Sequence, residues 1–272
     1  MKKAVLISSI AFQIIVSQVF AQNKTDNVRL FQSYFFDVPI AKTIYLEPGL
    51  EYATSSTKFL GTKFSISSFV VGAKGGYPIN EKIELGAQLG FLNLSADPGD
   101  SESGLTDVGV YGRYNIITQD ALNFSAGALV TLPIGEEKVG QSNLNFGAFG
   151  AIRYSLDNGF VLTGNLGIIF YETTTTDYKQ TGTDQWGYPI YEYVEETNRE
   201  NYLNLGFGGI YTVSPELNIV GELTIKTEMD YMMLSGGVDY LLGTGRLRGA
   251  LGLGLDDGAP DFQIMLGYGL SF

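Results

Sequence analysis

The last stretch of the chain, Asp261-Phe262-Gln263-Ile264-Met265-Leu266-Gly267-Tyr268-Gly269-Leu270-Ser271-Phe272, decides the fold. Every second residue from Phe262 to Phe272 is large and apolar, and the residues between them are mostly small or polar. Strict alternation indicates a strand with one apolar face. A tilted strand crosses a bilayer with about 9–11 residues, so this stretch is long enough to span one. Because every backbone group must be paired in lipid, we expect the strand to belong to a closed barrel.

The composition suits an exported all-β chain. The 272 residues include 35 Gly, 17 Tyr and 17 Phe but only 8 Pro, and the formal net charge is −12. Frequent glycines and aromatic residues are typical of many strands joined by tight turns. A chain this acidic repels phosphate backbones, so we expect no nucleic-acid partner.

Residues 1–21 have the pattern of a cleaved secretory signal. Lys2 and Lys3 precede a short apolar run, and the small residue Ala21 ends the predicted cleavage site. The alternative, a membrane anchor, needs a longer apolar run. Residues 22–42 show no clear alternation, and we assign no strand to them. This N-terminal segment is expected to lie along the periplasmic rim, to enter the lumen or to be partly ordered.

Residues 43–272 are predicted to form the barrel. Twelve alternating stretches cover residues 43–54, 62–77, 82–94, 105–116, 121–132, 143–156, 160–171, 201–213, 216–227, 231–242, 246–255 and 261–272. In the second of them, Phe64 and Ile66 follow one phase whereas Phe69 and Val71 follow the other. A bulge near Ser67 would reconcile the two phases.

Two further patterns agree with a membrane barrel. Short turns alternate with longer polar loops along the chain, as in outer-membrane barrels with short periplasmic turns and long outer loops. The strand ends next to the short turns carry outward aromatic residues: Tyr77, Tyr114, Tyr154, Phe160, Tyr211, Tyr240 and Phe272. Such a ring is typical of a membrane interface. We therefore predict an all-β, 12-stranded antiparallel transmembrane β-barrel in the bacterial outer membrane, surrounded by lipid bilayer and lipopolysaccharide.

The inward positions of these strands are the candidate lumen-lining residues. They are Glu47, Glu51, Glu84, Asp107, Tyr111, Arg113, Arg153, Glu222, Lys226, Asp239 and Arg248. Charges of both signs in a narrow barrel pair across it, which favours a filled or constricted lumen. Inward glycines such as Gly86 and Gly208 favour an open path, because they remove side-chain volume, or else they permit strand curvature.

The longest predicted outer loop, residues 172–200, is rich in Thr, Tyr and acidic residues. Its aromatic residues Trp186, Tyr188, Tyr191 and Tyr193 are candidates for capping the pore or binding a ligand. A plain solvated loop is the alternative. Enzyme function is disfavoured, because without His or Cys neither a Ser-His nor a Cys-His nucleophile pair is available. We expect no catalytic residue, no metal and no cofactor.

Three segments resemble a family of outer-membrane β-barrels labelled for the MetA-pathway of phenol degradation. They are residues 104–114, the sequence Leu132-Pro133-Ile134-Gly135, and residues 258–272. The resemblance implies twelve strands and transport of hydrophobic compounds. The terminal aromatic Phe272 also resembles the signal that the outer-membrane assembly machinery reads. We therefore expect a porin-like transport protein for small hydrophobic or aromatic solutes. The alternative is a non-conducting structural barrel whose outer loops bind partners.

Overall fold

The computed structural model describes residues 28–59, 62–136, 139, 144–156 and 158–272. The predicted signal, residues 1–21, lies outside the described residues. The strands are β1 Tyr45–Phe59, β2 Thr62–Asn80, β3 Ile83–Asp97, β4 Ser101–Leu105, β5 Val108–Thr118, β6 Leu122–Leu132, β7 Asn145–Ser155, β8 Phe160–Thr183, β9 Pro189–Thr212, β10 Leu217–Lys226, β11 Tyr231–Leu242, β12 Gly245–Gly254 and β13 Phe262–Ser271. None of the described segments is a helix of the length and apolarity that a membrane span requires.

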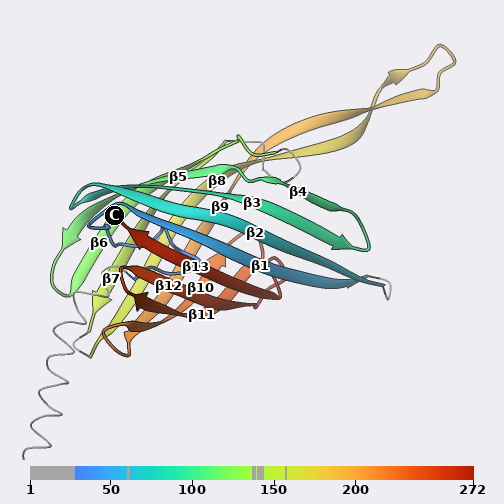
Figure 1. Cartoon of the computed structure of the whole chain (residues 1–272). Helices are drawn as coiled ribbons and strands as arrows, with labels where there is room; N and C mark the ends of the chain where they lie inside the picture. Colours follow the sequence, from blue (N-terminus) through green and yellow to red (C-terminus); the bar gives the residue numbers. More distant parts are fainter. Residues whose placement is uncertain (1–27, 60–61, 137–138, 140–143, 157) are drawn as a thin grey trace, which may run out of the picture.

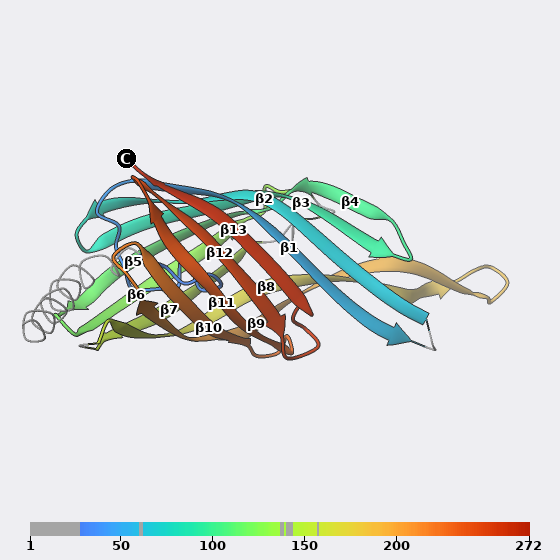
Figure 2. The same cartoon turned by 60° about the horizontal axis from the view of Figure 1, so that its bottom comes forward.

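The strands of the barrel pair antiparallel with their neighbours (Figures 1 and 2). The pairing runs from β3 through β2, β1 and β13 and on to β5, and β3 pairs with β5 to close the ring. The predicted 12-stranded antiparallel barrel is thus confirmed, with β4 as an additional short strand. Closure leaves no sheet edge in the apolar part of the described wall, as lipid requires.

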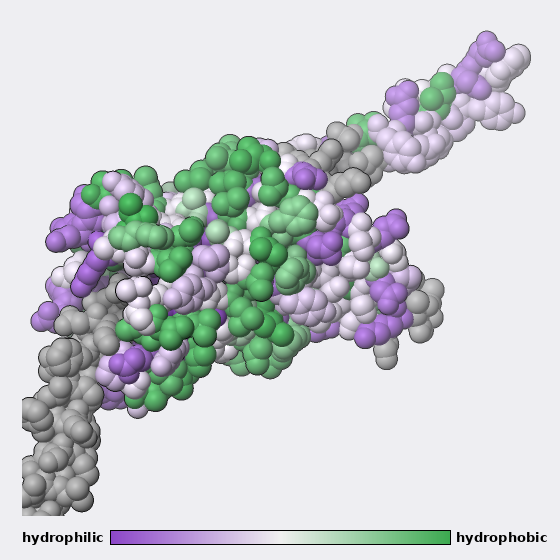
Figure 3. Space-filling model, in the orientation of Figure 1, coloured by the Kyte–Doolittle hydropathy of each residue, from purple (hydrophilic) through white to green (hydrophobic). Residues whose placement is uncertain are grey.

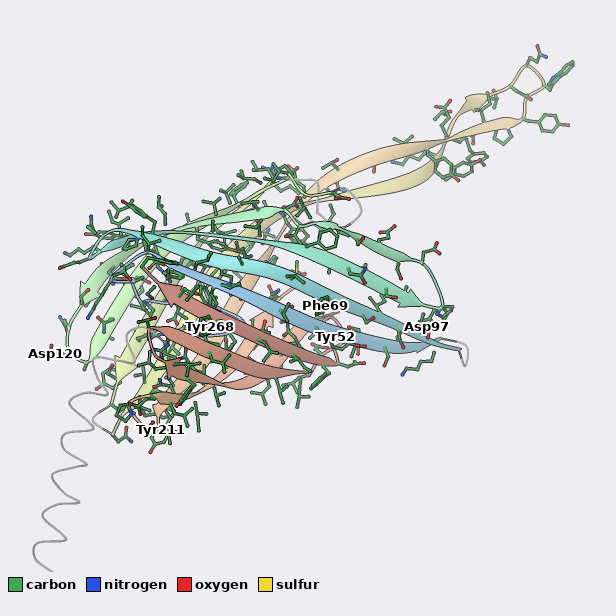
Figure 4. The ribbon with its side chains drawn as sticks, in the orientation of Figure 1. Tyr52, Phe69, Asp97, Asp120, Tyr211 and Tyr268 are labelled. Atoms are coloured by element: carbon green, nitrogen blue, oxygen red, sulfur yellow. The ribbon has the colours of Figure 1, made fainter. Side chains whose placement is uncertain are left out.

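The two ends of the barrel differ in their connections. Short turns join the strands at one end, where Asp120 lies, whereas the long β8–β9 hairpin projects from the other end, where Asp97 lies (Figure 4). We call these the short-turn end and the hairpin end. Tyr211 lies toward the short-turn end, whereas Tyr52 and Phe69 lie toward the hairpin end (Figure 4).

The apolar side chains of the wall point outward. Figure 3 shows much hydrophobic surface over the body of the barrel on the face drawn, and more hydrophilic surface toward the ends. Most residues of the predicted aromatic ring are exposed: Tyr77, Tyr114, Tyr154, Tyr211, Tyr240 and Phe272. Phe160 is half-buried, because its ring lies beside that of Tyr211 with centroids 6.3 Å apart. The outer surface thus matches what a bilayer and its interface require.

The strand predicted for residues 105–116 is interrupted. Leu105 ends β4 and Val108 begins β5, and both strands pair with β3. The Thr106 hydroxyl replaces a backbone partner at the break, accepting a hydrogen bond from Gly90 N at 3.0 Å. Between the pairing of β3 with β4 and its pairing with β5, the register shifts by one residue, as it does at a β-bulge.

The bulge predicted near Ser67 is wrong. β2 pairs with β1 in one unbroken register from Gly76 to Thr62. The pairing of β1 with β13 ends at Thr54, so the β1–β2 hairpin continues past that neighbour. Phe64 follows the inward phase but is exposed, because a two-stranded projection has no interior.

The predicted outer loop at residues 172–200 is mostly a β-hairpin. β8 and β9 stay paired from Phe160 and Tyr211 at the barrel to Thr183 and Pro189 near the tip. The paired strands project far beyond the wall (Figure 1). Residues 172–200 therefore continue the two strands instead of ending them.

Candidate lumenal site

Residues 28–41, which we call the plug, lie inside the barrel and form no strand. The first apolar residues of the plug pack against the inner wall. This buried cluster contains Val28, Leu30, Phe31, Val161, Ile210, Val220, Ala250 and Met265. Tyr34 and Phe35 form a second cluster with Tyr45, and Tyr111 packs against it. The plug therefore fills part of the lumen as a small hydrophobic core.

Inward glycines make room for the plug. A Cβ added to Gly237 would lie 2.7 Å from the ring of Phe31, and one added to Gly208 would lie 3.0 Å from Leu30. A Cβ on Gly86 would overlap a plug ring, that of Phe35. Plug side chains, together with neighbouring wall atoms, thus occupy the volume that these glycines leave free.

Glu84 on β3 holds both ends of the plug. Its carboxylate pairs with Arg29 at 2.9 Å and with Arg113 of β5, and it accepts a hydrogen bond from the Tyr45 hydroxyl at 3.0 Å. The backbone N–H of Ala41 donates to the same carboxylate at 2.6 Å. Glu84 is buried, and charge-assisted hydrogen bonds shielded from water are the strong ones.

Asp37 in the plug pairs with Arg153 on β7. Arg153 Nε donates to Asp37 Oδ1 at 2.8 Å, and Arg153 Nη2 donates to the carbonyl of Val28 at 2.6 Å. Burial disfavours the charged carboxylate, but the Arg153 guanidinium outweighs burial, so the pKa of Asp37 lies below its ordinary value. The folded protein therefore favours the charged form of Asp37.

Arg248 on β12 joins two wall carboxylates to the plug backbone. Its Nη1 lies 2.8 and 2.9 Å from the two carboxylate oxygens of Glu47, and its Nε lies 3.1 Å from Asp239 Oδ2. Its Nη2 donates to the carbonyls of Arg29 and Leu30. A buried charge needs partners of this kind, because removal from water is costly.

Glu222 on β10 accepts hydrogen bonds from three consecutive backbone N–H groups of the plug. The donors are Phe31 at 3.1 Å, Gln32 at 2.9 Å and Ser33 at 2.8 Å. Successive N–H groups that converge on one anion form a nest. Here the anion belongs to the wall, so the nest fixes the plug to β10.

Two other lumen-lining candidates lie beyond the plug, toward the hairpin end. Glu51 accepts a hydrogen bond from Gln263 at 2.7 Å. Lys226 Nζ lies 4.3 Å from the centre of the Tyr231 ring. Among the described residues, neither Glu51 nor Lys226 makes a hydrogen bond or ion pair with the plug.

The last two candidates, Asp107 and Tyr111, lie near the start of β5. Tyr111 stacks on the plug residue Phe35 with ring centroids 4.1 Å apart. Asp107 accepts a hydrogen bond from Gly135 N at 3.0 Å, beside the break between β4 and β5. Tyr111 therefore belongs to the plug contacts, and Asp107 connects the break to a neighbouring loop.

Two cavities adjoin the plug. The outer cavity, of about 350 Å³, lies toward the hairpin end, and its wall includes Phe31, Val70 and Met265. The inner cavity, of about 230 Å³, lies toward the short-turn end, next to Lys42 and Thr244. The plug therefore does not fill the lumen completely.

The aromatic candidates of residues 172–200 lie outside the barrel. Trp186, Tyr188 and Tyr193 are 75, 68 and 78 % exposed on the projecting hairpin. Tyr191 stacks on Tyr178 with ring centroids 5.1 Å apart. These rings form an exposed aromatic surface instead of a cap over the pore.

None of the plug residues is among the candidate site residues predicted from the sequence. Arg29 and Asp37 each make a buried ion pair, and Phe31, Tyr34 and Phe35 are all buried. The aromatic residues crowded between positions 31 and 36 were the available signal, because such a segment is poorly suited to stay in water.

The fold and the site together define an outer-membrane β-barrel with a plugged lumen. The model of the family described as the MetA-pathway of phenol degradation matches residues 54–272, and the chain belongs to this family. The resemblance noted in the sequence is confirmed. Among curated proteins, no sequence matches the chain.

Solved structures of other outer-membrane barrels are similar in fold. The COG4313 outer membrane channel from Pseudomonas putida F1 is 16 % identical, with a TM-score of 0.64, covering 87 % of this chain and 98 % of that one. The translocator domain of the autotransporter NalP from Neisseria meningitidis is 9 % identical, with a TM-score of 0.54, covering 86 % and 90 %. The beta domain of the Bordetella autotransporter BrkA is 15 % identical, with a TM-score of 0.53, covering 85 % and 99 %.

Proposed function

We propose that this protein is an outer-membrane channel for small hydrophobic or aromatic solutes. The outer cavity carries the proposal. Its volume of about 350 Å³ falls within the range of small-molecule sites, about 300–1,000 Å³, and its wall combines Phe31, Val70 and Met265 with a few polar groups. Membership of the phenol-degradation family supports this function.

The orientation and partners belong to the same proposal. The short-turn end faces the periplasm, and the hairpin end faces the outside, next to lipopolysaccharide. Residues 1–21 direct export in a Gram-negative cell and are then removed. Phe272, which is exposed, is the residue that the assembly machinery reads. We assign the protein no catalytic activity, no metal and no cofactor.

Uptake of radiolabelled phenol tests the channel. The purified barrel is reconstituted into vesicles whose outer leaflet is lipopolysaccharide, because plain phospholipid lets small aromatic compounds through unaided. We expect faster uptake than into protein-free vesicles of the same composition. Equal rates would refute the channel, provided that heat-dependent migration in a denaturing gel shows the barrel to be folded.

The projecting β8–β9 hairpin supports a second candidate function, a non-conducting barrel that binds partners at the cell surface. Its exposed Trp186, Tyr188 and Tyr193 are residue types that interfaces use as anchors. Excision of residues 173–198 separates the two candidates. The channel predicts that the shortened protein takes up phenol at the unchanged rate. The surface-binding function predicts that adhesion is lost and that neither form passes phenol.

A further inference from the structure

The two cavities beside the plug share one boundary. Glu47 and Arg248 line both the outer and the inner cavity. Their ion pair, with Arg248 Nη1 2.8 Å from Glu47 Oε1, therefore lies between them. Tyr34 of the plug donates a further hydrogen bond to Glu47 Oε2 at 3.1 Å. The side chains of Glu47, Arg248 and Tyr34 thus meet at the boundary between the two cavities.

Two inward glycines of β13 leave space beside Glu47. Gly267 lines the outer cavity, and a Cβ added there would lie 2.9 Å from Glu47 Oε1. Gly269 lines the inner cavity, and a Cβ added there would lie 3.7 Å from Glu47 Oε2. At these two positions β13 has no side chain that could block a passing solute.

Arg248 has several other partners, and Glu47 has a second cation beside it. Arg248 also contacts Asp239 and two plug carbonyls, so it stays paired when Glu47 leaves. Lys74 is the direct cross-strand neighbour of Glu47 on β2. No ion pair of Lys74 is present among the described residues, and its Nζ lies 5.0 Å from the centre of the Tyr34 ring. A carboxylate that moves between two cations avoids the cost of an unpaired buried charge.

We propose that Glu47 is the gate of the solute path, an inference that rests on the proposed channel function. In the closed state Glu47 pairs with Arg248 and separates the two cavities. In the open state it pairs with Lys74, and the solute passes along Gly267 and Gly269. The plug stays bound in both states, because the movement does not disturb its contacts with the other wall carboxylates.

Three variants test the gate in the phenol-uptake assay. Glu47→Ala removes the gate and is expected to raise the uptake rate several-fold, and Glu47→Gln, which keeps the side-chain shape, is expected to raise it less. Gly269→Leu fills the inner cavity and is expected to reduce uptake to nearly the protein-free rate. Gly221→Leu is the matched control, because Gly221 is exposed and a Cβ there meets no atom within 4 Å. Heat-dependent gel migration confirms that each variant is folded before it is assayed.

Each outcome supports or refutes the gate. If the unmodified protein takes up phenol but the Glu47 and Gly269 variants match it, the gate is wrong and the channel survives. If Glu222→Ala, which loosens the plug, speeds uptake as much as Glu47→Ala does, displacement of the plug opens the path and the gate is wrong. If neither the unmodified protein nor Glu47→Ala exceeds protein-free vesicles, the channel itself is refuted, and the gate with it. If Glu47→Ala alone exceeds protein-free vesicles, the unmodified protein is not a channel, and the gate is refuted with it.

Discussion

Replacement of Glu222 by alanine is expected to release the plug from the barrel wall. The substitution removes the acceptor of the three N–H groups of Phe31, Gln32 and Ser33, which lie 2.8 to 3.1 Å from its carboxylate oxygens. Glu222 is 2 % exposed, so little water can reach the three N–H groups to replace the lost carboxylate as their acceptor.

The size of the effect follows from the hydrogen bonds that are lost. A hydrogen bond to a charged group contributes about 1.5–3 kcal/mol. Three bonds that share one carboxylate do not simply add, and burial of that carboxylate is itself costly, so we expect roughly 2–4 kcal/mol in total. Since about 1.4 kcal/mol is a tenfold change, the population with a released plug should rise roughly 30- to 700-fold.

A single cysteine measures this population. The chain has no cysteine, and Ser33 is 2 % exposed, so Ser33→Cys places one shielded thiol inside the plug. The labelling rate with a water-soluble thiol reagent reports the released population when the plug rebinds faster than it reacts. Glu81→Ala, at an exposed carboxylate in a short turn, is the control. Equal labelling rates with and without the Glu222 side chain would show that the nest does not hold the plug.

Three further predictions concern the plug and the assembly of the barrel. The Asp37–Arg153 pair should stabilise the plug fully above the unfolded-state pKa of Asp37, about 3.9, and lose this contribution as the pH falls through the lower folded-state pKa. The Ser33→Cys labelling rate, divided by the rate for a free cysteine at the same pH because only the thiolate reacts, should therefore rise in strong acid. Asp37→Asn should remove this acid-dependent part of the rise. Gly86→Val should force a plug ring out of its place and destabilise the plug by about 1–3 kcal/mol, seen as faster labelling; a rate like that of the parent protein would contradict the packing. Deletion of Phe272 should lower the yield of folded barrel in the outer membrane while leaving refolding in detergent unchanged, and equal losses in both would point to stability instead of recognition.

The barrel could be predicted from the sequence because a lipid-facing wall imposes one rule on every strand. Side chains alternate with period two, and one face must be apolar, so residues such as Leu251 and Leu266 reveal their strands locally. The rule fails where lipid is absent. Phe64 lies on a projection exposed on both faces, and the pattern there suggested a bulge that β2 does not have.

The plug could not be predicted in the same way, because its structure depends on partners far away in the sequence. Arg29 pairs with Glu84, and Ser33 bonds to Glu222, 189 positions further along the chain. No local period encodes such contacts. The break between β4 and β5 was also missed, since the bond that the Thr106 hydroxyl accepts from Gly90 N on the neighbouring strand follows no local period.

The inward glycines separate the two functions of the lumen. At Gly86 and Gly237, a plug side chain lies within 3.0 Å of the place where a Cβ would stand. At Gly267 and Gly269, that space borders the two cavities and the Glu47 carboxylate. The first pair of glycines accommodates a bound segment, and the second pair leaves a passage beside it. A bound plug and a route for a solute are therefore compatible in one barrel, because the glycines beside the plug lie on β3 and β11, whereas the glycines beside the cavities lie on β13.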